Sequence, residues 1–196
     1  KSAYDAADSD SRVLVVITPT KSWYPDAKGG VGLVGSYGSS GCVVWVWNNT
    51  WLSAGDTISH EVGHALGLRH SGYWNIPESD IREYYRGHGE DSNGWAPIMG
   101  YGGGEARFLT TWDNGSYPFA SSDQDQKAVI SGLLGVLTDD HGGTTATATT
   151  LPAQGAGPVF EGSGRLETSS DVDYFRLQMP EGFWVFEAIA NPFGKN

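Results

Sequence analysis

The stretch HEVGHALGLRHS, from His60 to Ser71, decides how the rest of the chain is interpreted. If residues 60 to 66 are helical, His60 and His64 project from the same face one turn apart, so both imidazoles can reach one metal ion. Glu61 is rotated by about 100° from His60. Its carboxylate would therefore lie beside such an ion, where it can take a proton from a metal-bound water.

A glycine and a third histidine complete the pattern. Gly67 follows the last helical residues, where a left-handed backbone conformation can end a helix and redirect the chain. His70 can then return as a third ligand. Three neutral histidines leave the fourth position of a tetrahedral zinc ion open to water, which is typical of a catalytic zinc site. We therefore predict zinc as the cofactor, with the ligands His60, His64 and His70, and Glu61 as the general base.

Composition limits the class of protein. The chain has 196 residues, enough for one full domain and part of another. Its net charge of -11 and its lack of a basic run argue against nucleic-acid partners. No apolar run approaches the length of a membrane span. Cys42 is the single cysteine, which excludes an internal disulfide. We expect a secreted, monomeric bacterial protein, and the absence of a signal-peptide pattern suggests a processed form.

Hydrophobic patterns predict the elements that would surround the histidines. The apolar, β-branched runs at residues 12–18 and 42–47 predict buried strands. A helix is expected from about residue 54 to 66, with Ser53 as its N-cap. Its apolar residues would pack on a sheet while the histidines face a cleft. A second helix is expected over about residues 123–134.

The composition changes after Thr138. Residues 139–157 are rich in Thr and Gly and predict a linker without a core-forming pattern. Residues 158–196 predict three short strands of a β-module that ends before its sheet is complete. Within it, Asp171 and Asp173 offer oxygen ligands for calcium, or else form and solvate a turn. The expected domains are thus 1–138, the linker 139–157 and the module 158–196.

With these strands, the histidine-bearing helix and Met99 in APIMGYGG, residues 12–138 resemble the metzincin clan of zinc peptidases. The stretch from His60 to Ser71 is most similar to the matrixin helix, and residues 121–135 are similar to the last matrixin helix. Tyr101, two residues after the methionine, is similar to its counterpart in astacins and serralysins. The resemblance implies an α+β fold of the α/β/α metzincin type, with a twisted mixed sheet, an active-site helix and a C-terminal helix.

The resemblance also implies roles for residues outside the histidine motif. Met99 would form a hydrophobic floor under the zinc ligands, although any core methionine would fit the same position. Tyr101 would bind zinc in the resting enzyme and donate a hydrogen bond to the developing oxyanion, or would simply pack. The glycine-rich stretch would be the edge strand that pairs with an extended substrate, over Val31, Gly32, Leu33, Val34, Gly35 and Ser36. The residues from Asp139 to the DVDYFRL segment resemble the start of a bacterial pre-peptidase C-terminal β-module.

The expected function is that of a secreted zinc endopeptidase that hydrolyses extended peptide or protein substrates through a zinc-bound water activated by Glu61. Three alternatives remain. In the first, the same fold forms a catalytically weak or inactive zinc-binding or adhesion module of a larger extracellular protein. A different zinc-hydrolase clan would use a downstream glutamate ligand, for which Glu78 and Glu83 are at a suitable separation. Finally, the C-terminal module could be the functional part, binding polymers or assisting secretion.

Overall fold

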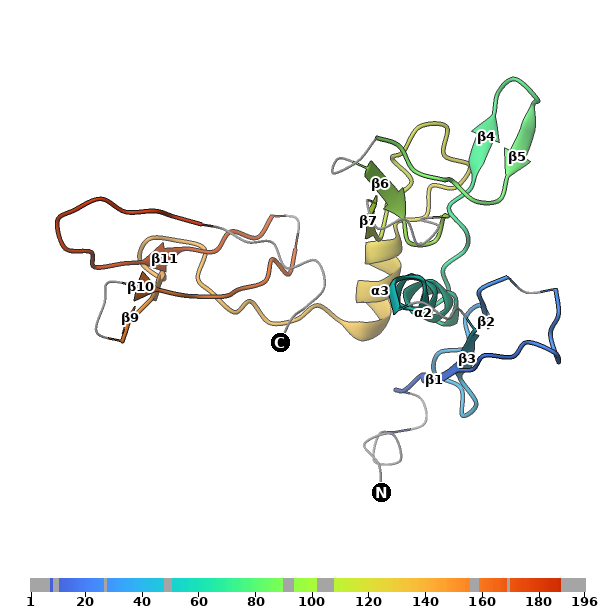
Figure 1. Cartoon of the computed structure of the whole chain (residues 1–196), viewed down its shortest axis with the longest axis horizontal. Coiled ribbons are helices and arrows are strands. Elements are labelled where there is room, and N and C mark those ends of the chain that lie inside the picture. Colours follow the sequence, from blue (N-terminus) through green and yellow to red (C-terminus); the bar gives the residue numbers. More distant parts are fainter. Residues whose placement is uncertain are drawn as a thin grey trace. The chain divides into compact units, whose positions relative to one another are not determined.

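The structure is a computed structural model of the chain. It describes residues 8, 11–26, 28–47, 51–89, 94–101, 108–155, 159–168 and 170–187. The chain divides into two compact units, Lys1–Leu134 and Gly135–Asn196 (Figure 1). Within the described ranges, no helix has the length and apolar character needed to cross a membrane.

Helices and short strands both occur in the first unit, which makes the chain α+β as predicted. The described elements of this unit are β1 (Leu14–Ile17), β2 (Gly30–Gly32), β3 (Val43–Val46), α2 (Trp51–Ala65), β4 (Tyr73–Asn75), β5 (Asp80–Arg82), β6 (Gly94–Pro97), β7 (Phe108–Thr111) and α3 (Gln126–Leu134). The second unit contains β8 (Thr149–Thr150), β9 (Ala153–Gln154), β10 (Val159–Phe160) and β11 (Phe175–Arg176).

A three-stranded mixed sheet lies at the start of the first unit, in the order β1-β3-β2. β1 runs parallel to β3, and β2 runs antiparallel to it. Val44 and Val46 of the central strand are fully buried, because alternate residues of a strand point to the same face. The two strands predicted from apolar runs are present as β1 and β3, each slightly shorter than predicted. The predicted burial is wrong for β1, an outer strand in which Leu14 and Ile17 are exposed.

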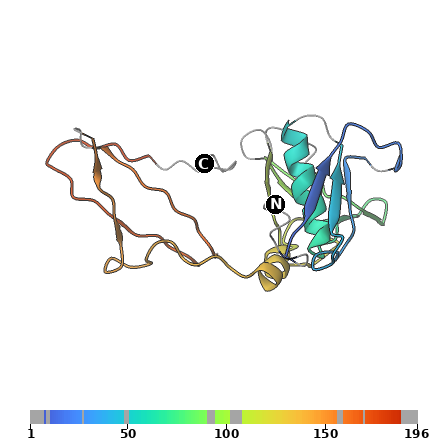
Figure 2. The ribbon, with the colours of Figure 1, turned by 90° about the horizontal axis from the view of Figure 1, so that it is seen from below.

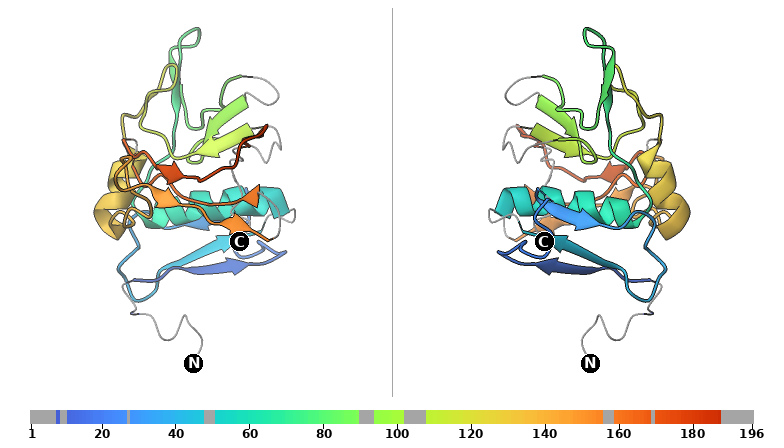
Figure 3. Two further views of the ribbon diagram at one scale, coloured as in Figure 1. Left: turned by 90° about the vertical axis from the view of Figure 1, so that its left-hand side faces the viewer. Right: turned by 90° about the vertical axis from the view of Figure 1, so that its right-hand side faces the viewer.

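The helix α2 packs against this sheet. Val62 and Ala65 contact Cys42 and Val44, which form the small apolar core of the unit. Figures 2 and 3 show α2 lying along the sheet, with the β6–β7 pair on its other side. The helix begins at Trp51 and not at residue 54, so the predicted N-cap Ser53 is wrong. Trp and Leu are compatible with a helix, and they extend its first turn backwards.

The C-terminal end of α2 confirms the predicted role of Gly67. This residue has a φ of 96°, in the left-handed region that favours glycine. Its N–H donates to the carbonyl of His64 at 2.8 Å, and the N–H of Leu68 donates to that of Gly63 at 2.9 Å. These two hydrogen bonds form a Schellman motif, which ends the helix and reverses the chain. The reversal carries the chain back towards His70.

The predicted edge strand is only partly correct. Gly30–Gly32 form β2, whereas Leu33, Val34, Gly35 and Ser36 lie outside the strand. The N–H groups of Gly35 and Tyr37 donate to the carbonyls of His64 and Ala65, at 2.8 and 2.9 Å. This segment therefore caps the end of α2 and does not continue the sheet. Gly35, with a φ of 72°, allows the chain to turn there.

The remaining elements of the first unit are a hairpin, a strand pair and a helix. β4 and β5 form an antiparallel hairpin, and β6 runs parallel to β7. The second predicted helix is confirmed as α3, but it begins at Gln126 and not near residue 123. The Asp125 carboxylate accepts a hydrogen bond from the N–H of Ala128 at 2.9 Å, as an N-cap residue does.

The second unit differs from the predicted linker and module. β8 and β9 both lie within residues 139–157, which were expected to lack secondary structure, and the unit begins after Leu134. The ring of His141 helps to order this stretch, because it hydrogen-bonds Thr149 Oγ1 at 2.8 Å and the carbonyl of Ser163 at 2.7 Å. The predicted linker over 139–157 thus contains two short strands, β8 and β9.

The strands of the second unit are short. β8 pairs with β11 in parallel, and β9 pairs with β10 in antiparallel orientation. Two of the three predicted strands are present, as β10 and β11, and each is only two residues long. The third strand was predicted over residues 183–189. Residues 183–187 contain no strand, and residues 188–189 lie outside the described residues.

Candidate metal centre

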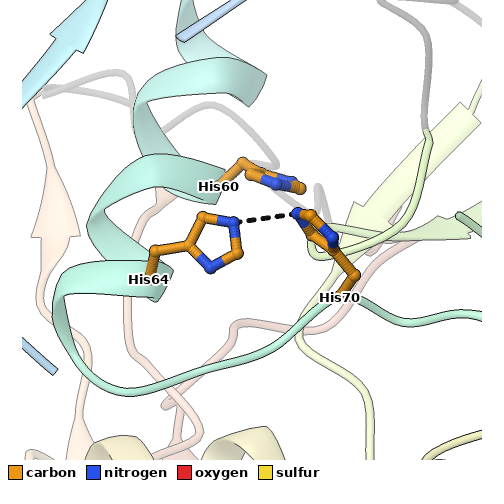
Figure 4. A group of neighbouring side chains, drawn as sticks. All are labelled: His60, His64 and His70. Atoms are coloured by element: carbon orange, nitrogen blue, oxygen red, sulfur yellow. Dashed lines mark hydrogen bonds between the residues drawn. The ribbon is translucent and has the colours of Figure 1, made fainter. Parts of the chain in front are cut away.

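The three predicted histidine ligands lie together. His60 and His64 project from α2, and His70 projects from the segment that follows the Schellman motif (Figure 4). Their ring centroids are 4.8 Å apart for His60 and His64, 4.7 Å for His64 and His70, and 5.2 Å for His60 and His70. One nitrogen of each ring lies within 4.8 Å of the others, so the group is able to hold a metal ion.

Hydrogen bonds fix the orientation of every ring. In each histidine, Nδ1 lies 2.7–2.8 Å from an oxygen, namely the carbonyl of Ile98 for His60, the carbonyl of Leu68 for His64 and Oε1 of Glu83 for His70. Carbonyl and carboxylate oxygens accept hydrogen bonds and do not donate them. The proton in each of these hydrogen bonds therefore belongs to Nδ1. The lone pair of each neutral ring is then on Nε2, the usual arrangement in a metal-ligating histidine.

The contact between His64 and His70 fits a bound cation. Their Nε2 atoms are 3.0 Å apart. When both rings are protonated on Nδ1, two lone pairs face each other at this distance, and their repulsion is relieved by a cation that both can ligate. The donor set therefore fits a metal ion.

Burial keeps these histidines neutral. Desolvation lowers the pKa of His60 from 6.5 to about 4, because the charged imidazolium is disfavoured away from water. Desolvation is also the largest cause that lowers the pKa of His64 and of His70, although the nearby Glu83 opposes the shift. At neutral pH all three rings are thus in the form that donates a lone pair.

Glu61 lies in the narrow space between α2 and β2. Its residue is 6% exposed. A Cβ atom on Gly30 would come within 2.7 Å of its Oε1, and one on Gly32 would meet its main-chain oxygen, so the two glycines permit this close approach. Desolvation raises the pKa of Glu61 to about 7, while a hydrogen bond from the Gly32 N–H opposes the shift. Its carboxylate therefore changes protonation near neutral pH.

A turn after β6 connects the first ligand to the segment of the third. The carbonyl of Ile98 accepts the hydrogen bond from His60, and that of Met99 accepts one from the N–H of Ser71 at 2.8 Å. The Met99 side chain is fully buried, and a Cβ atom on Gly63 would lie 2.6 Å from its sulfur. Met99 thus packs directly under α2 at the turn that bears the histidines.

Tyr101 is less closely associated with the site. The residue is 52% exposed, and the guanidinium of Arg86 lies 5.4 Å from the centre of its ring. Its main-chain N–H donates to the carbonyl of Tyr85 at 2.8 Å. The contacts described for Tyr101 do not bring its phenol to the three histidines.

A different tyrosine, Tyr84, lies against the site and was missed in the sequence. Its ring centroid is 4.3 Å from that of His70 and 6.3 Å from that of His60. Desolvation raises the pKa of its phenol to about 12, with added contributions from Glu83 and Glu61. Tyr84 therefore remains a neutral hydrogen-bond donor at every pH at which the histidines could bind a metal.

Neither downstream glutamate joins the three histidines as a ligand. Glu83 accepts the hydrogen bond from Nδ1 of His70 at 2.7 Å, so it lies behind that ring. Glu78 forms an ion pair with Arg82. The described contacts thus give no support to a site with two histidines and a glutamate.

A buried polar network holds the segment after the third histidine. Ser71 Oγ donates to Asp113 Oδ2 at 2.6 Å and accepts from Gln126 Nε2 at 2.9 Å. Gln126 Oε1 in turn accepts from the N–H of Asp113 at 3.1 Å. The three residues are 1%, 7% and 2% exposed. Because each buried group has a partner, the network ties the start of α3 to the chain beside His70.

Comparisons with protein-family models, with curated proteins and with solved structures found no match for this chain.

Proposed function

We propose that the chain is a zinc-dependent endopeptidase of the metzincin type. The observation that carries the proposal is the convergence of His60, His64 and His70, with the buried Glu61 next to His60 on the same helix. Two nitrogen ligands of a tetrahedral zinc ion are about 3.3 Å apart, given Zn–N bonds of about 2.0–2.1 Å. The 3.0 Å between Nε2 of His64 and Nε2 of His70 is close to that separation. Neutral imidazoles are also among the preferred ligands of zinc.

Zinc, when bound, supplies Lewis acidity, which polarises a carbonyl and lowers the pKa of water. Glu61 is proposed to accept the proton of the attacking water and to deliver it to the nitrogen of the departing amine. A group with a pKa near 7 suits both transfers at neutral pH. The N–H of Gly32 supports this role because it holds the carboxylate in place.

Tyr84 is proposed to donate a hydrogen bond to the oxygen that gains negative charge as the peptide bond is attacked. Support comes from its position against His70 and from the raised pKa of its phenol, which keeps the proton on the oxygen. In this role the phenol would exchange its hydrogen bond with Glu83 for one to the substrate. The same role was expected of Tyr101 from the resemblance to astacins and serralysins. The described contacts favour Tyr84.

The proposed substrate is an extended peptide segment. β2 is an outer strand of its sheet, and it lies directly beside Glu61. An extended chain can add to such an edge through main-chain hydrogen bonds. Leu33 and Val34, just after the strand, are 74% and 50% exposed and offer apolar contacts to the substrate. We further propose that the protein acts outside the cell, in keeping with its acidic, cysteine-poor composition.

Substitution of the base tests this function. Glu61→Gln keeps the shape of the side chain but removes its basicity. We expect it to lower the rate of hydrolysis of an unfolded protein substrate by roughly 10²–10⁴-fold, while the zinc content measured by atomic absorption is unchanged. Glu78→Gln, at an exposed glutamate outside the histidine group, is the matched control and should leave the rate unchanged.

Two outcomes would contradict the proposal. Hydrolysis that continues in Glu61→Gln at the original rate would exclude Glu61 as the base. A zinc-loaded wild-type chain that cleaves no member of a random peptide pool would favour the inactive binding module. A chelator should abolish cleavage, and added zinc should restore it.

A further inference from the structure

Five carboxylates gather within the second unit. Metal-capable oxygens lie within 4.8 Å of one another in two groups, which are Asp139, Glu167 and Asp171, and Asp139, Asp140 and Asp173. Asp139 belongs to both groups. The cluster therefore joins the start of the unit to the segment 167–173.

Several of these oxygens are buried without a partner. The side chain of Glu167 is 3% exposed, and neither of its carboxylate oxygens has a hydrogen-bond partner. Oδ1 of Asp173 is also buried and unpartnered. A carboxylate without a donor or a cation is costly to remove from water. The orphaned oxygens of Glu167 lie beside the other carboxylates, so they point to a cation in the same space.

The positive groups described around the cluster do not balance it. Arg165 Nε is 3.6 Å from Glu167 Oε1 and 3.7 Å from Asp140 Oδ2, beyond hydrogen-bond distance. The ring of His141 approaches Asp140 at 3.8 Å, but it hydrogen-bonds Thr149 and the Ser163 carbonyl. Even with His141 protonated, these two positive groups leave most of the five negative charges uncompensated.

Main-chain groups orient the carboxylates. The N–H of Glu167 donates to Asp171 Oδ2 at 2.9 Å, and the N–H of His141 donates to Asp139 Oδ1 at 3.0 Å. Each of these bonds uses one oxygen of its carboxylate, so the side chain is fixed while it can still bind a cation. Burial and the neighbouring acidic groups also raise the pKa of Glu167 and of Asp173, as expected where negative charges are crowded.

We propose that this cluster binds calcium. Its ligands are all carboxylate oxygens, which suit a hard cation and not zinc. Calcium accepts six to eight oxygens in flexible geometry, whereas magnesium requires a near-octahedral set and retains its waters. The carboxylates around Asp139 are crowded and lie on loops, so they match the preference of calcium. The ion draws Asp139 and Asp140 to the segment 167–173 and so completes the fold of the second unit.

Calcium titration of the full chain tests the site. The chain is first treated with chelator and reloaded with zinc, so that the histidines are occupied. Isothermal titration with CaCl₂ should give saturable binding with a Kd on the order of 10⁻⁶–10⁻³ M. The melting temperature of the second unit should rise with calcium, and magnesium should bind at least about tenfold more weakly.

Two glutamates of the second unit give a matched pair of variants. Glu167→Gln removes one charge from the cluster and should weaken calcium binding at least about tenfold. Glu161→Gln removes one charge from an exposed position in the same unit and should bind calcium like the wild type. Terbium provides a second measurement, because Tyr174 follows Asp173 and can sensitise terbium luminescence, which calcium should then quench by displacement.

The outcomes that overturn the proposal are distinct. The site would be excluded if a chain with a folded far-ultraviolet spectrum showed neither binding heat nor a thermal shift at calcium concentrations up to about 10 mM, roughly tenfold above the weakest Kd of extracellular calcium modules. Equal calcium affinity in Glu167→Gln and Glu161→Gln would show that binding occurs elsewhere. Neither result bears on peptide hydrolysis, since the cluster lies wholly within the second unit.

Discussion

Two tyrosines compete for the same role beside the histidines. Tyr101 follows the methionine at the spacing seen in the resembling families, yet its ring is half exposed and lies beneath Arg86. Tyr84 has no comparable sequence signal, but its ring packs on His70. The proposed oxyanion donor has to lie near the histidines and keep its proton, and these two requirements favour Tyr84.

Removal of each hydroxyl separates the two assignments. Tyr84→Phe should lower kcat by roughly 10–10³-fold with little change in KM, because the lost hydrogen bond forms only as charge develops. Tyr101→Phe, the matched control, should change kcat by less than about threefold. Zinc affinity should stay the same in Tyr84→Phe, which distinguishes a lost donor from a damaged metal site. If the two effects are reversed, the role belongs to Tyr101.

The sequence predicts that the three histidines lie together, because a helix has a fixed geometry. The spacing of His60 and His64 specifies one face, and Gly67 marks where the chain turns back to His70. Tyr84 could not be found in this way. Its position depends on the β4–β5 hairpin, whose returning strand brings Glu83 and Tyr84 to His70, and no local pattern encodes that long-range contact.

At the scale of elements, glycines set how closely the neighbours of α2 approach. Gly30 and Gly32 let β2 lie against Glu61, and Gly63 lets the Met99 turn lie against the helix. The Met99 turn also provides the Ile98 carbonyl that orients His60. The packing of α2 is therefore coupled to the geometry of the first ligand.

Two glycines of the same helix allow this coupling to be tested. A Cβ atom on Gly63 would lie 2.6 Å from Met99 Sδ and 3.1 Å from the ring of Trp112, so Gly63→Ala should destabilise the first unit by about 1–3 kcal/mol. Gly55 has open space around it, and Gly55→Ala should stabilise the helix by about 0.5–1 kcal/mol. Urea unfolding followed by circular dichroism measures both changes. Stabilisation in both variants would exclude a close contact at Gly63.

Elements with a strong local pattern were predictable, and those governed by tertiary hydrogen bonds were not. The apolar, β-branched runs predict β1 and β3 as strands, although only β3 is buried. The glycine-rich run after Gly32 could equally be strand or turn. It is a turn because the N–H groups of Gly35 and Tyr37 donate to the last carbonyls of α2. These hydrogen bonds form only in the folded chain, so no local sequence pattern predicts them.

For the whole molecule, the metal-free site makes stability depend on pH in two opposing ways. The pKa of His60 falls from 6.5 to about 4 on folding, so the unfolded chain binds more protons between these values. This contribution makes stability rise with pH in that range. The pKa of Glu61 rises from 4.5 to about 7, so the folded chain binds more protons there. This second contribution makes stability fall as pH rises from 4.5 to 7.

Glu61→Gln isolates the second contribution. Relative to the wild type, the metal-free variant should gain about 1–3 kcal/mol of unfolding free energy as the pH rises from 4.5 to above 7. Urea unfolding of the two chains at a series of pH values measures the difference. Glu78→Gln, at a largely exposed side chain, should differ from the wild type by an amount that does not change with pH. A constant difference for Glu61→Gln would contradict the assigned pKa shift.

The division into two parts was expected from the change of composition, but its position was not. The change after Thr138 is real, yet the Thr-rich stretch that follows forms β8 and β9. Small polar residues resemble a linker in composition, and hydrogen bonds such as those of His141 decide whether they are ordered. Composition alone carries no information about these partners.

The oxygens that accept the Nδ1 hydrogen bonds of the three histidines differ in whether a mutation can remove them. His60 and His64 are oriented by main-chain carbonyls, which no single codon change can delete. His70 is oriented by a side chain, Glu83, which one nucleotide can replace. Metal retention could thus be adjusted, in evolution or by engineering, at Glu83 without altering any ligand.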